Sequence, residues 1–223
     1  MKHLRSILLS FAMLCLPKMV VAQMQPVDLG LSVKWASCNL GASSPEEYGE
    51  YFAWGEIEAK EEYSVDTYRW GESWSKNLPE FKRLIKYNRE PSYGKVDNKT
   101  SLEESDDAAH VRLGGKWRLP KSKEIQELIS TKDNDRYCWE WKSVNGHNGW
   151  MITYLENNSS IFLPAAGAWF EREHHMIDSC GCYWSSYLNK DSRDAMFGGF
   201  VPDDVFRDHM PRVCGLSVRP VME

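Results

Sequence analysis

The 223-residue sequence lacks a hydrophobic run long enough to cross a membrane. Its apolar stretch at residues 7–16 is short, whereas a spanning helix needs about 20 apolar residues. Lys2 and Arg5 precede this stretch, and the small residues Val20, Val21 and Ala22 follow it. A basic start, a short apolar run and a small-residue cleavage site are typical of a secretory signal peptide. We therefore expect residues 1–22 to be removed on export, and residues 23–223 to form a single domain that does not span the membrane.

The sequence also lacks a basic patch. Its 32 acidic residues outnumber its 27 Lys and Arg, which gives a formal net charge of −5. Three of the cations, Lys2, Arg5 and Lys18, lie in the expected signal peptide, and their removal takes the charge from −5 to −8. An acidic surface repels nucleic acid and anionic lipid. Neither is expected as a main partner.

Paired metal-binding cysteines are absent. No Cys-x-x-Cys motif or spaced histidine pair accompanies Cys180-x-Cys182, so a disulfide or an inert thiol is favoured over zinc. Cys15 follows Leu14, where a lipoprotein would have a small residue, and this favours a soluble exported protein. Export permits disulfides. Because an odd number of cysteines follows residue 22, at least one is a free thiol or forms an intermolecular bridge.

Phosphate-binding loops are missing as well. Gly114 and Gly115 lack the third glycine of a dinucleotide loop, and Lys121 and Ser122 follow Pro120 rather than the glycine run of a P-loop. The two glycines are instead expected to end a helix.

No complete catalytic motif is present. His174 and His175 are adjacent, so on a strand they would point to opposite faces and could seldom share a metal. Ser185 and Ser186 lack the Gly-x-Ser-x-Gly turn of a nucleophilic serine. Acidic pairs are abundant and are expected to be solvated or to form turns. The sequence thus predicts no catalytic residue, cofactor or metal ligand.

The residue patterns predict a mixed fold. Alternating Leu31, Val33 and Trp35 indicate an opening strand. A helix is expected at residues 106–113, and a second at residues 122–131 with Ser122 as its cap. Short apolar segments follow, including a hairpin whose Asn-Asn turn lies between residues 154 and 161. Helices early and antiparallel strands late argue for an α+β domain.

Residues 56–107 form a polar and irregular tract, which we call the insert. A short helix is predicted within it at residues 79–87. A tract of this length in a compact domain is expected to be a functional or packed loop.

Aromatic residues are the most suggestive feature, because the chain contains ten tryptophans. Tryptophan faces bind sugars and form protein hot spots, although most tryptophans in such a domain are expected in the core. The candidate ligand-binding residues are Trp139, Trp141, Trp169, Trp184, Asp203 and Asp204.

Five sequence blocks, in this order, resemble the Fibrobacter succinogenes major paralogous domain family of exported Bacteroidetes and Fibrobacter proteins. The blocks are VDLGLSVKWASCNLGASSPEEYGEYFAWGE, DDAAHVRLGGKWRLP, SIFLPAAG, GCYWSS and GLSVRPV. The resemblance implies a C-type lectin-like fold, shared with formylglycine-generating enzymes, in which two short helices pack on twisted antiparallel sheet with long irregular loops.

The resemblance does not extend to the metal-binding and sugar-binding motifs of these proteins, so it implies the fold and not an activity. Cys180-x-Cys182 does not match the late copper-binding cysteine pair of formylglycine-generating enzymes. Trp184-Ser185-Ser186 replaces the Trp-Asn-Asp of calcium-dependent lectins. Relatives often carry cysteines near Cys38 and Cys138, which implies a bridge between these two. If the late strands lie close together, Cys214 is expected to pair with Cys180 or Cys182.

The function expected from these observations is an exported, non-enzymatic binding or adhesion module. Its aromatic and acidic loops would recognise a glycan or an extracellular or cell-surface protein, with the protein periplasmic, on the cell surface or secreted. One alternative is a copper-dependent oxidoreductase related to formylglycine-generating enzymes that uses Cys180, Cys182 or Cys214. Another is a structural subunit of a cell-surface assembly.

Overall fold

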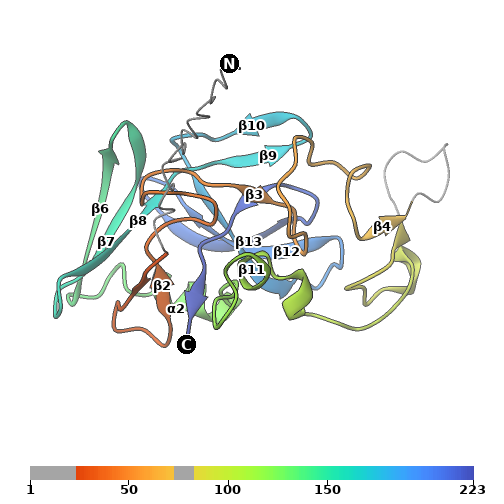
Figure 1. Cartoon of the computed structure of the whole chain (residues 1–223), viewed down its shortest axis with the longest axis horizontal. Coiled ribbons are helices and arrows are strands. Elements are labelled where there is room, and N and C mark those ends of the chain that lie inside the picture. Colours follow the sequence, from red (N-terminus) through yellow and green to blue (C-terminus); the bar gives the residue numbers. More distant parts are fainter. Residues whose placement is uncertain (1–23, 73–82) are drawn as a thin grey trace, which may run out of the picture.

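The computed structural model describes residues 24–72 and 83–223, which form several small β-sheets and two α-helices (Figure 1). The predicted α+β class is confirmed. The expected signal peptide lies outside the described residues. Within these two ranges, no helix has both the length and the apolar character needed to cross a membrane.

A five-stranded sheet separates two of the three hydrophobic clusters of the described residues. Its strand order is β13 (Val205–Pro211), β12 (Asp194–Phe200), β11 (Gly181–Leu188), β14 (Leu216–Ser217) and β3 (Tyr51–Phe52). Only the β11–β14 pairing within this sheet is parallel. Tyr183 packs into one core and Trp184 into the other, because successive side chains of a strand point to opposite faces. Both faces of β11 are therefore buried.

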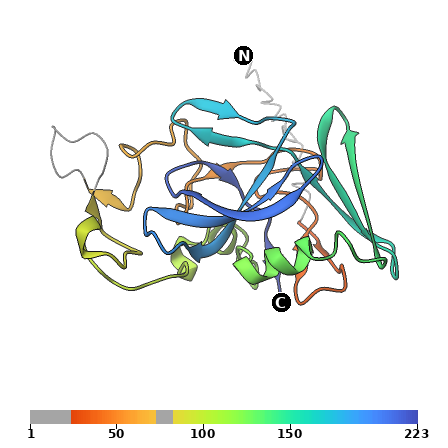
Figure 2. The ribbon, with the colours of Figure 1, turned by 180° about the vertical axis from the view of Figure 1, so that it is seen from behind.

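A second, three-stranded sheet lies at one end of the molecule (Figures 1 and 2). It comprises β6 (Tyr137–Val144), β7 (His147–Tyr154) and β8 (Ser159–Pro164). Asn145 and Gly146 join the first two strands with φ of 49° and 88°, as a two-residue hairpin turn requires. The predicted Asn157–Asn158 turn joins the next pair, with Asn158 at φ 57°.

The two ends of the described chain meet in a third sheet. Its order is β1 (Pro26–Val27), β2 (Lys34–Ala36) and β15 (Val221–Met222), in which Trp35 is paired with Val221. The predicted opening strand is thus present but starts only at Lys34. The buried guanidinium of Arg219 donates hydrogen bonds to the side-chain oxygen of Asn39 and to the carbonyls of Ala36 and Phe162. These bonds tie the terminal sheet to β8.

The first predicted helix is α1 (Ala108–Leu113), preceded by the short 3₁₀ turn Glu104–Asp106. Asp107 caps it by accepting a hydrogen bond from the N–H of His110. The prediction that a glycine ends this helix is confirmed, because Gly114 has φ 69° and donates its N–H to the carbonyl of His110.

The second helix is α2 (Ser122–Ile129). The prediction that Ser122 caps it was wrong: Ser122 is the first helical residue, and Lys121 is the cap. The carboxylate of Glu124, the third helical residue, accepts the backbone N–H of Lys121, as the acid of a capping box does. Gly198 on β12 lets this helix dock, since a Cβ there would lie 2.7 Å from the Ile125 Cγ2 atom.

The insert is irregular where it is described, and it extends from the end of the molecule opposite the β6–β8 sheet (Figures 1 and 2). Its regular elements are β4 (Gly71–Glu72), β5 (Arg83–Leu84) and the 3₁₀ turns Pro91–Tyr93 and Glu104–Asp106. The helix predicted at residues 79–87 was wrong at Arg83–Leu84, which pair with β4 instead. Residues 79–82 lie outside the described part.

Candidate binding site

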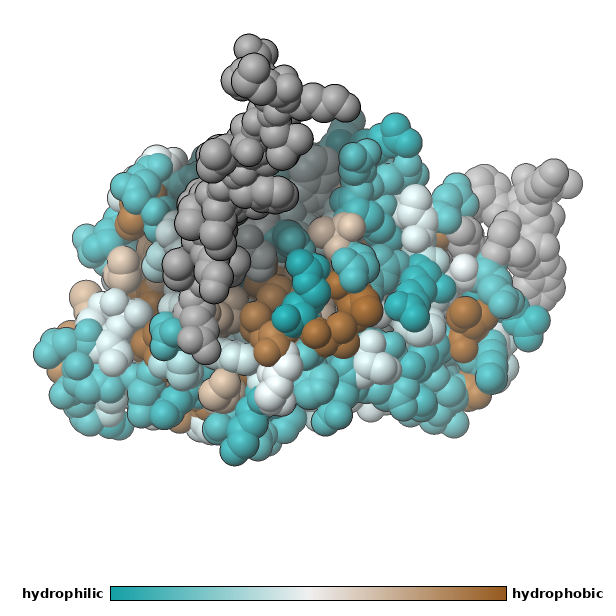
Figure 3. Space-filling model, in the orientation of Figure 1, coloured by the Kyte–Doolittle hydropathy of each residue, from teal (hydrophilic) through white to brown (hydrophobic). Residues whose placement is uncertain are grey.

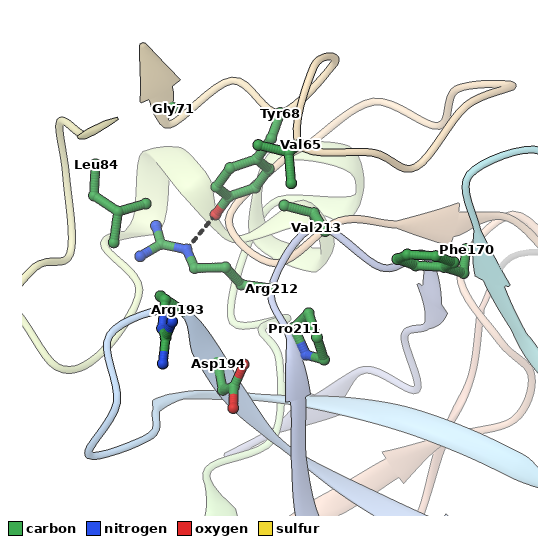
Figure 4. A pocket seen from close by; sticks show the side chains of 10 residues that line it. All are labelled: Val65, Tyr68, Gly71, Leu84, Phe170, Arg193, Asp194, Pro211, Arg212 and Val213. Atoms are coloured by element: carbon green, nitrogen blue, oxygen red, sulfur yellow. Dashed lines mark hydrogen bonds between the residues drawn. The ribbon is translucent and has the colours of Figure 1, made fainter. Parts of the chain in front are cut away.

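A cavity of about 310 Å³ lies between the insert and the central sheet, and we call it the insert pocket (Figure 4). Phe170, at the end of β9 (Ala168–Phe170), lies at one side of the pocket, and Leu84 of the insert lies at the other (Figure 4). The ten lining residues are Val65, Tyr68, Gly71, Leu84, Phe170, Arg193, Asp194, Pro211, Arg212 and Val213. Three segments that are far apart in the sequence therefore build one pocket.

Most of the lining is apolar, and its charged groups already have partners. Asp194 Oδ2 lies 2.8 Å from His209 Nδ1, and the Arg193 guanidinium forms an ion pair with Asp191 at 2.6 Å. The pocket thus offers a mainly apolar surface with one acid and one base at its margin. This composition suits an apolar group.

Arg212 forms the wall between the pocket and the core, and it is only 1% exposed. Its Nη1 atom donates hydrogen bonds to the carbonyls of Tyr87 and Ser192, and its Nη2 atom to that of Lys86. Its Nε atom donates to the hydroxyl of Tyr68. A buried guanidinium is tolerated because carbonyl dipoles and a hydroxyl replace its hydration. Since Tyr87 and Lys86 belong to the insert, Arg212 holds this wall of the pocket in place.

Tyr68 completes the wall. Burial raises the pKa of its hydroxyl to about 12, so the group remains protonated at neutral pH. The proton is donated to the carbonyl of Trp54 at 2.7 Å, while the oxygen accepts from Arg212. The ring therefore has a fixed orientation at the edge of the pocket.

The β9–β10 hairpin beside the pocket exposes apolar side chains. Phe170 is 47% exposed, and Met176 and Ile177, which follow β10 (Glu173–His175), are each 43% exposed. The face of the molecule seen in Figure 3 is mainly hydrophilic, with several hydrophobic areas. Of these three side chains, Phe170 lines the pocket, and an exposed apolar side chain next to an apolar pocket is typical of a docking surface.

Of the predicted ligand-binding tryptophans, Trp184 belongs to the interior and Trp169 is half-buried. Trp184 is 1% exposed, and its Nε1 atom donates to the carbonyl of Phe52. Trp169 is surrounded by other rings: His174 stacks on it at 4.7 Å, and Tyr51 and Tyr63 lie 6.3 and 6.5 Å away. Trp184 is therefore inaccessible to a ligand, and one ring face of Trp169 is covered by His174.

Trp139 and Trp141 lie on β6 and are half-buried against Trp150. Asp203 and Asp204 are exposed in the turn between β12 and β13. The two pairs come near each other because Lys132 lies over the Trp150 ring at 4.9 Å and donates to the carbonyl of Asp203.

The six candidate residues therefore do not form one site. Trp139, Trp141, Asp203 and Asp204 gather near the β6–β8 sheet, whereas Trp169 and Trp184 lie elsewhere in the fold. None of the six lines the insert pocket.

The five cysteines of the described chain are free thiols, so the expected bridges are not formed. Cys38 is buried, with its Sγ atom 3.5 Å from the carbonyl of Ala42, whereas Cys138 is exposed on β6. Cys214 is buried and joined to neither Cys180 nor Cys182. Among residues 24–72 and 83–223, no three His, Cys, Asp or Glu side chains gather as a metal site.

Sequence reasoning missed the residues that matter most for the pocket, namely Val65, Leu84, Phe170 and Arg212. Only Arg212 had a recognisable signal. It stands within the apolar segment MPRVCGLSV, where a charged residue indicates a buried and fully hydrogen-bonded group. The other three are ordinary apolar residues whose role depends on the fold.

Comparison with known proteins places the chain in no group: no family model, no curated protein and no solved structure matches it.

Proposed function

We propose that this chain is an exported binding or adhesion module that recognises a protein, and that the insert pocket receives an apolar side chain of that partner. The observation that carries the proposal is the combination of an apolar pocket with the exposed Phe170 at its side. Buried anchor residues that fill such pockets supply most of the affinity of a typical protein interface.

The chemistry of the pocket favours a protein over a glycan. Each buried sugar hydroxyl needs a hydrogen-bonding partner, and an unpaired one costs about 1–3 kcal/mol. The charged lining residues are already occupied, Asp194 with His209 and Arg193 with Asp191. An apolar side chain needs no such partner and gains about 25 cal/mol for each Å² that it buries.

The neighbouring hairpin supports a protein ligand as well. Met176 and Ile177 add exposed apolar surface at the far end of the same hairpin, beyond the His175–Ala168 pair. Glu171, Arg172 and Glu173 are exposed in the same hairpin and would form a polar rim. Apolar centres with polar rims are the usual anatomy of protein interfaces.

The fold that we propose is the C-type lectin-like fold of the Fibrobacter succinogenes major paralogous domain family. Two short helices, antiparallel sheets and the long irregular insert support this assignment. The basic and apolar start of the sequence supports export to the periplasm, the cell surface or the medium.

The test is quantitative affinity capture from envelope and extracellular fractions of the source cells. Three variants of the full chain would be compared with the unchanged protein: Phe170→Ser at the side of the pocket, Val65→Trp to fill it, and Leu155→Ser as a control. Leu155 is as exposed as Phe170, at 48%, but lies in the β7–β8 turn away from the pocket.

The proposal expects one protein to be recovered about 10-fold less with each pocket variant and equally well with Leu155→Ser, consistent with the loss of a hot-spot residue. The purified partner should then bind the unchanged protein and Leu155→Ser with similar affinity, and each pocket variant more weakly. If all three variants capture the same proteins equally, the pocket is not the binding site. If the unchanged protein binds a glycan array and the pocket variants do not, the ligand of the pocket is a sugar and not a protein.

A further inference from the structure

Two sulphur atoms meet beside the central sheet. The Sγ atoms of Cys180 and Cys182 are 3.4 Å apart, and these residues are 5% and 1% exposed. Cys180 directly precedes β11 and Cys182 is its second residue, so both side chains are on the same face. A disulfide needs a sulphur–sulphur distance of about 2.05 Å, which rotation of the two short side chains can provide without moving distant elements.

The backbone around the pair is held from both sides. The N–H of Gly167 donates to the carbonyl of Cys180 at 2.7 Å, and Gly181 is paired with Phe200 of β12. No larger residue fits between the cysteines, because a Cβ at Gly181 would lie 2.9 Å from the carbonyl oxygen of Pro164. The fold therefore keeps the two thiols in contact.

We propose that Cys180 and Cys182 form a reversible disulfide across Gly181 when the protein meets an external disulfide, such as oxidised glutathione. The Cys180 thiolate attacks the external disulfide, forms a mixed disulfide and releases one thiol. The Cys182 thiolate then attacks the Cys180 sulphur and expels the second thiol. The pair loses two electrons and two protons, and the external disulfide becomes two thiols.

The surroundings assign different roles to the three buried thiols. The hydrogen bond between the Cys180 and Cys182 sulphur atoms lowers the pKa of the Cys180 thiol below its usual range. The same hydrogen bond, with burial, raises the pKa of Cys182. Burial raises the pKa of Cys214 to about 12, so this thiol stays protonated. Cys180 thus attacks first, and Cys214 takes no part.

Peptide mapping tests the bridge directly. The folded, reduced full chain would be incubated with oxidised glutathione, then quenched with acid, alkylated and digested with trypsin. Cleavage after Arg172 and Lys190 yields a fragment, residues 173–190, whose only cysteines are Cys180 and Cys182. We expect this fragment to be two hydrogen atoms lighter than its reduced form and to carry no alkyl group. Reduction should restore two alkylation sites.

Serine variants of single cysteines distinguish the Cys180–Cys182 bridge from disulfides that involve other cysteines. In fragment 173–190, Cys182→Ser should leave Cys180 as the unresolved mixed disulfide with glutathione and Cys180→Ser should leave an alkylated Cys182, whereas Cys214→Ser and Cys38→Ser should leave the bridge intact. The wild-type fragment decides the matter even if a serine variant does not fold. Full alkylation of both thiols in oxidised glutathione, or a crosslink from this fragment to Cys214, would overturn the proposal. Ligand capture does not enter the test, so its result is independent of the proposed binding function.

Discussion

The Nε atom of Arg212 lies 2.6 Å from the hydroxyl of Tyr68, and this hydrogen bond joins the last part of the chain to the insert inside the protein. Neither residue has a carboxylate partner in the described chain. The guanidinium is instead surrounded by carbonyls and by the rings of Trp54, Tyr68 and Tyr87, 5.1–5.9 Å from their centroids. Arg212 is thus one of the contacts that position the insert, and it does so directly at the pocket wall.

Replacing Arg212 by Met should therefore destabilise the fold by about 4 kcal/mol, because the carbonyls of Lys86, Tyr87 and Ser192 would lose a charged donor inside the protein. Urea unfolding measures this loss. Arg89→Met is the control, since Arg89 is an exposed arginine of the same insert. A loss of less than 1 kcal/mol for Arg212→Met would show that Arg212 does not anchor the insert.

Asp107→Ala should cost about 2–3 kcal/mol. One carboxylate oxygen accepts the N–H of His110 at the start of α1, and the other accepts the N–H of Leu119 in the link to α2. Alanine would leave a helix end uncapped and a buried donor unpaired. Thermal or urea unfolding gives the value, with Glu104→Ala, an exposed acid one turn earlier, expected to change stability by less than about 0.5 kcal/mol. Equal effects of the two substitutions would contradict the assigned role of Asp107.

The contribution of Glu124 should depend on pH. Burial raises the pKa of its carboxyl. Two hydrogen bonds from the Arg118 guanidinium, at 2.8 and 2.9 Å, and one from the N–H of Lys121 lower the pKa by more than burial raises it. The net pKa is therefore below the usual range. The unfolded chain therefore binds this proton more readily than the folded chain. The stabilisation is complete above the unfolded pKa of about 4.3 and is lost as the pH falls through the lower, folded pKa.

Glu124→Gln measures this effect. The variant should be about 2 kcal/mol less stable than the unchanged protein at pH 7, because charged hydrogen bonds are lost. The difference in the free energy of unfolding between the two proteins should be smaller at pH 3. Urea midpoints at pH 7, 5 and 3 provide the comparison, and a difference that stays constant over this range would rule out an ionised Glu124 as its source.

Trp184→Ala should destabilise the protein by about 3–5 kcal/mol, since it empties a fully buried site. Trp141→Ala should cost no more than about half as much, because Trp141 is only half-buried. Neither substitution should weaken binding of the protein partner when affinity is measured on folded material by calorimetry. A selective loss of affinity with Trp141→Ala would return the β6–β8 sheet to consideration as the binding surface.

Local structure could be predicted well because it depends on residues close together in the sequence. The glycine that ends α1, the stripe of Ile125 and Leu128, and the Asn157–Asn158 turn are all visible in short windows. The predictions of local structure that were wrong concern segments where a tertiary contact overrides the local pattern. Arg83–Leu84 has an amphipathic spacing, but pairing with Gly71–Glu72 makes it a strand.

The candidate site could not be predicted in the same way. Composition indicated that aromatic residues matter, but it could not separate the buried Trp184 from the half-exposed Trp141, because burial depends on what packs against each ring. The expected bridge of Cys38 with Cys138 fails for a similar reason. The fold keeps Cys38 in the interior and leaves Cys138 on the outer side of β6.

The sequence by itself determined the α+β class, the two helices with the link between them, and the irregular character of the insert. Each of these follows from periodicity, glycine placement or composition over a few tens of residues. Only the tertiary structure decided where the pocket lies and which thiols meet. Val65, Phe170 and Arg212 are more than a hundred positions apart at their extremes, and no pattern along the chain records that they face one cavity. Their convergence results from sheet pairing and from the hydrogen bonds of one buried arginine.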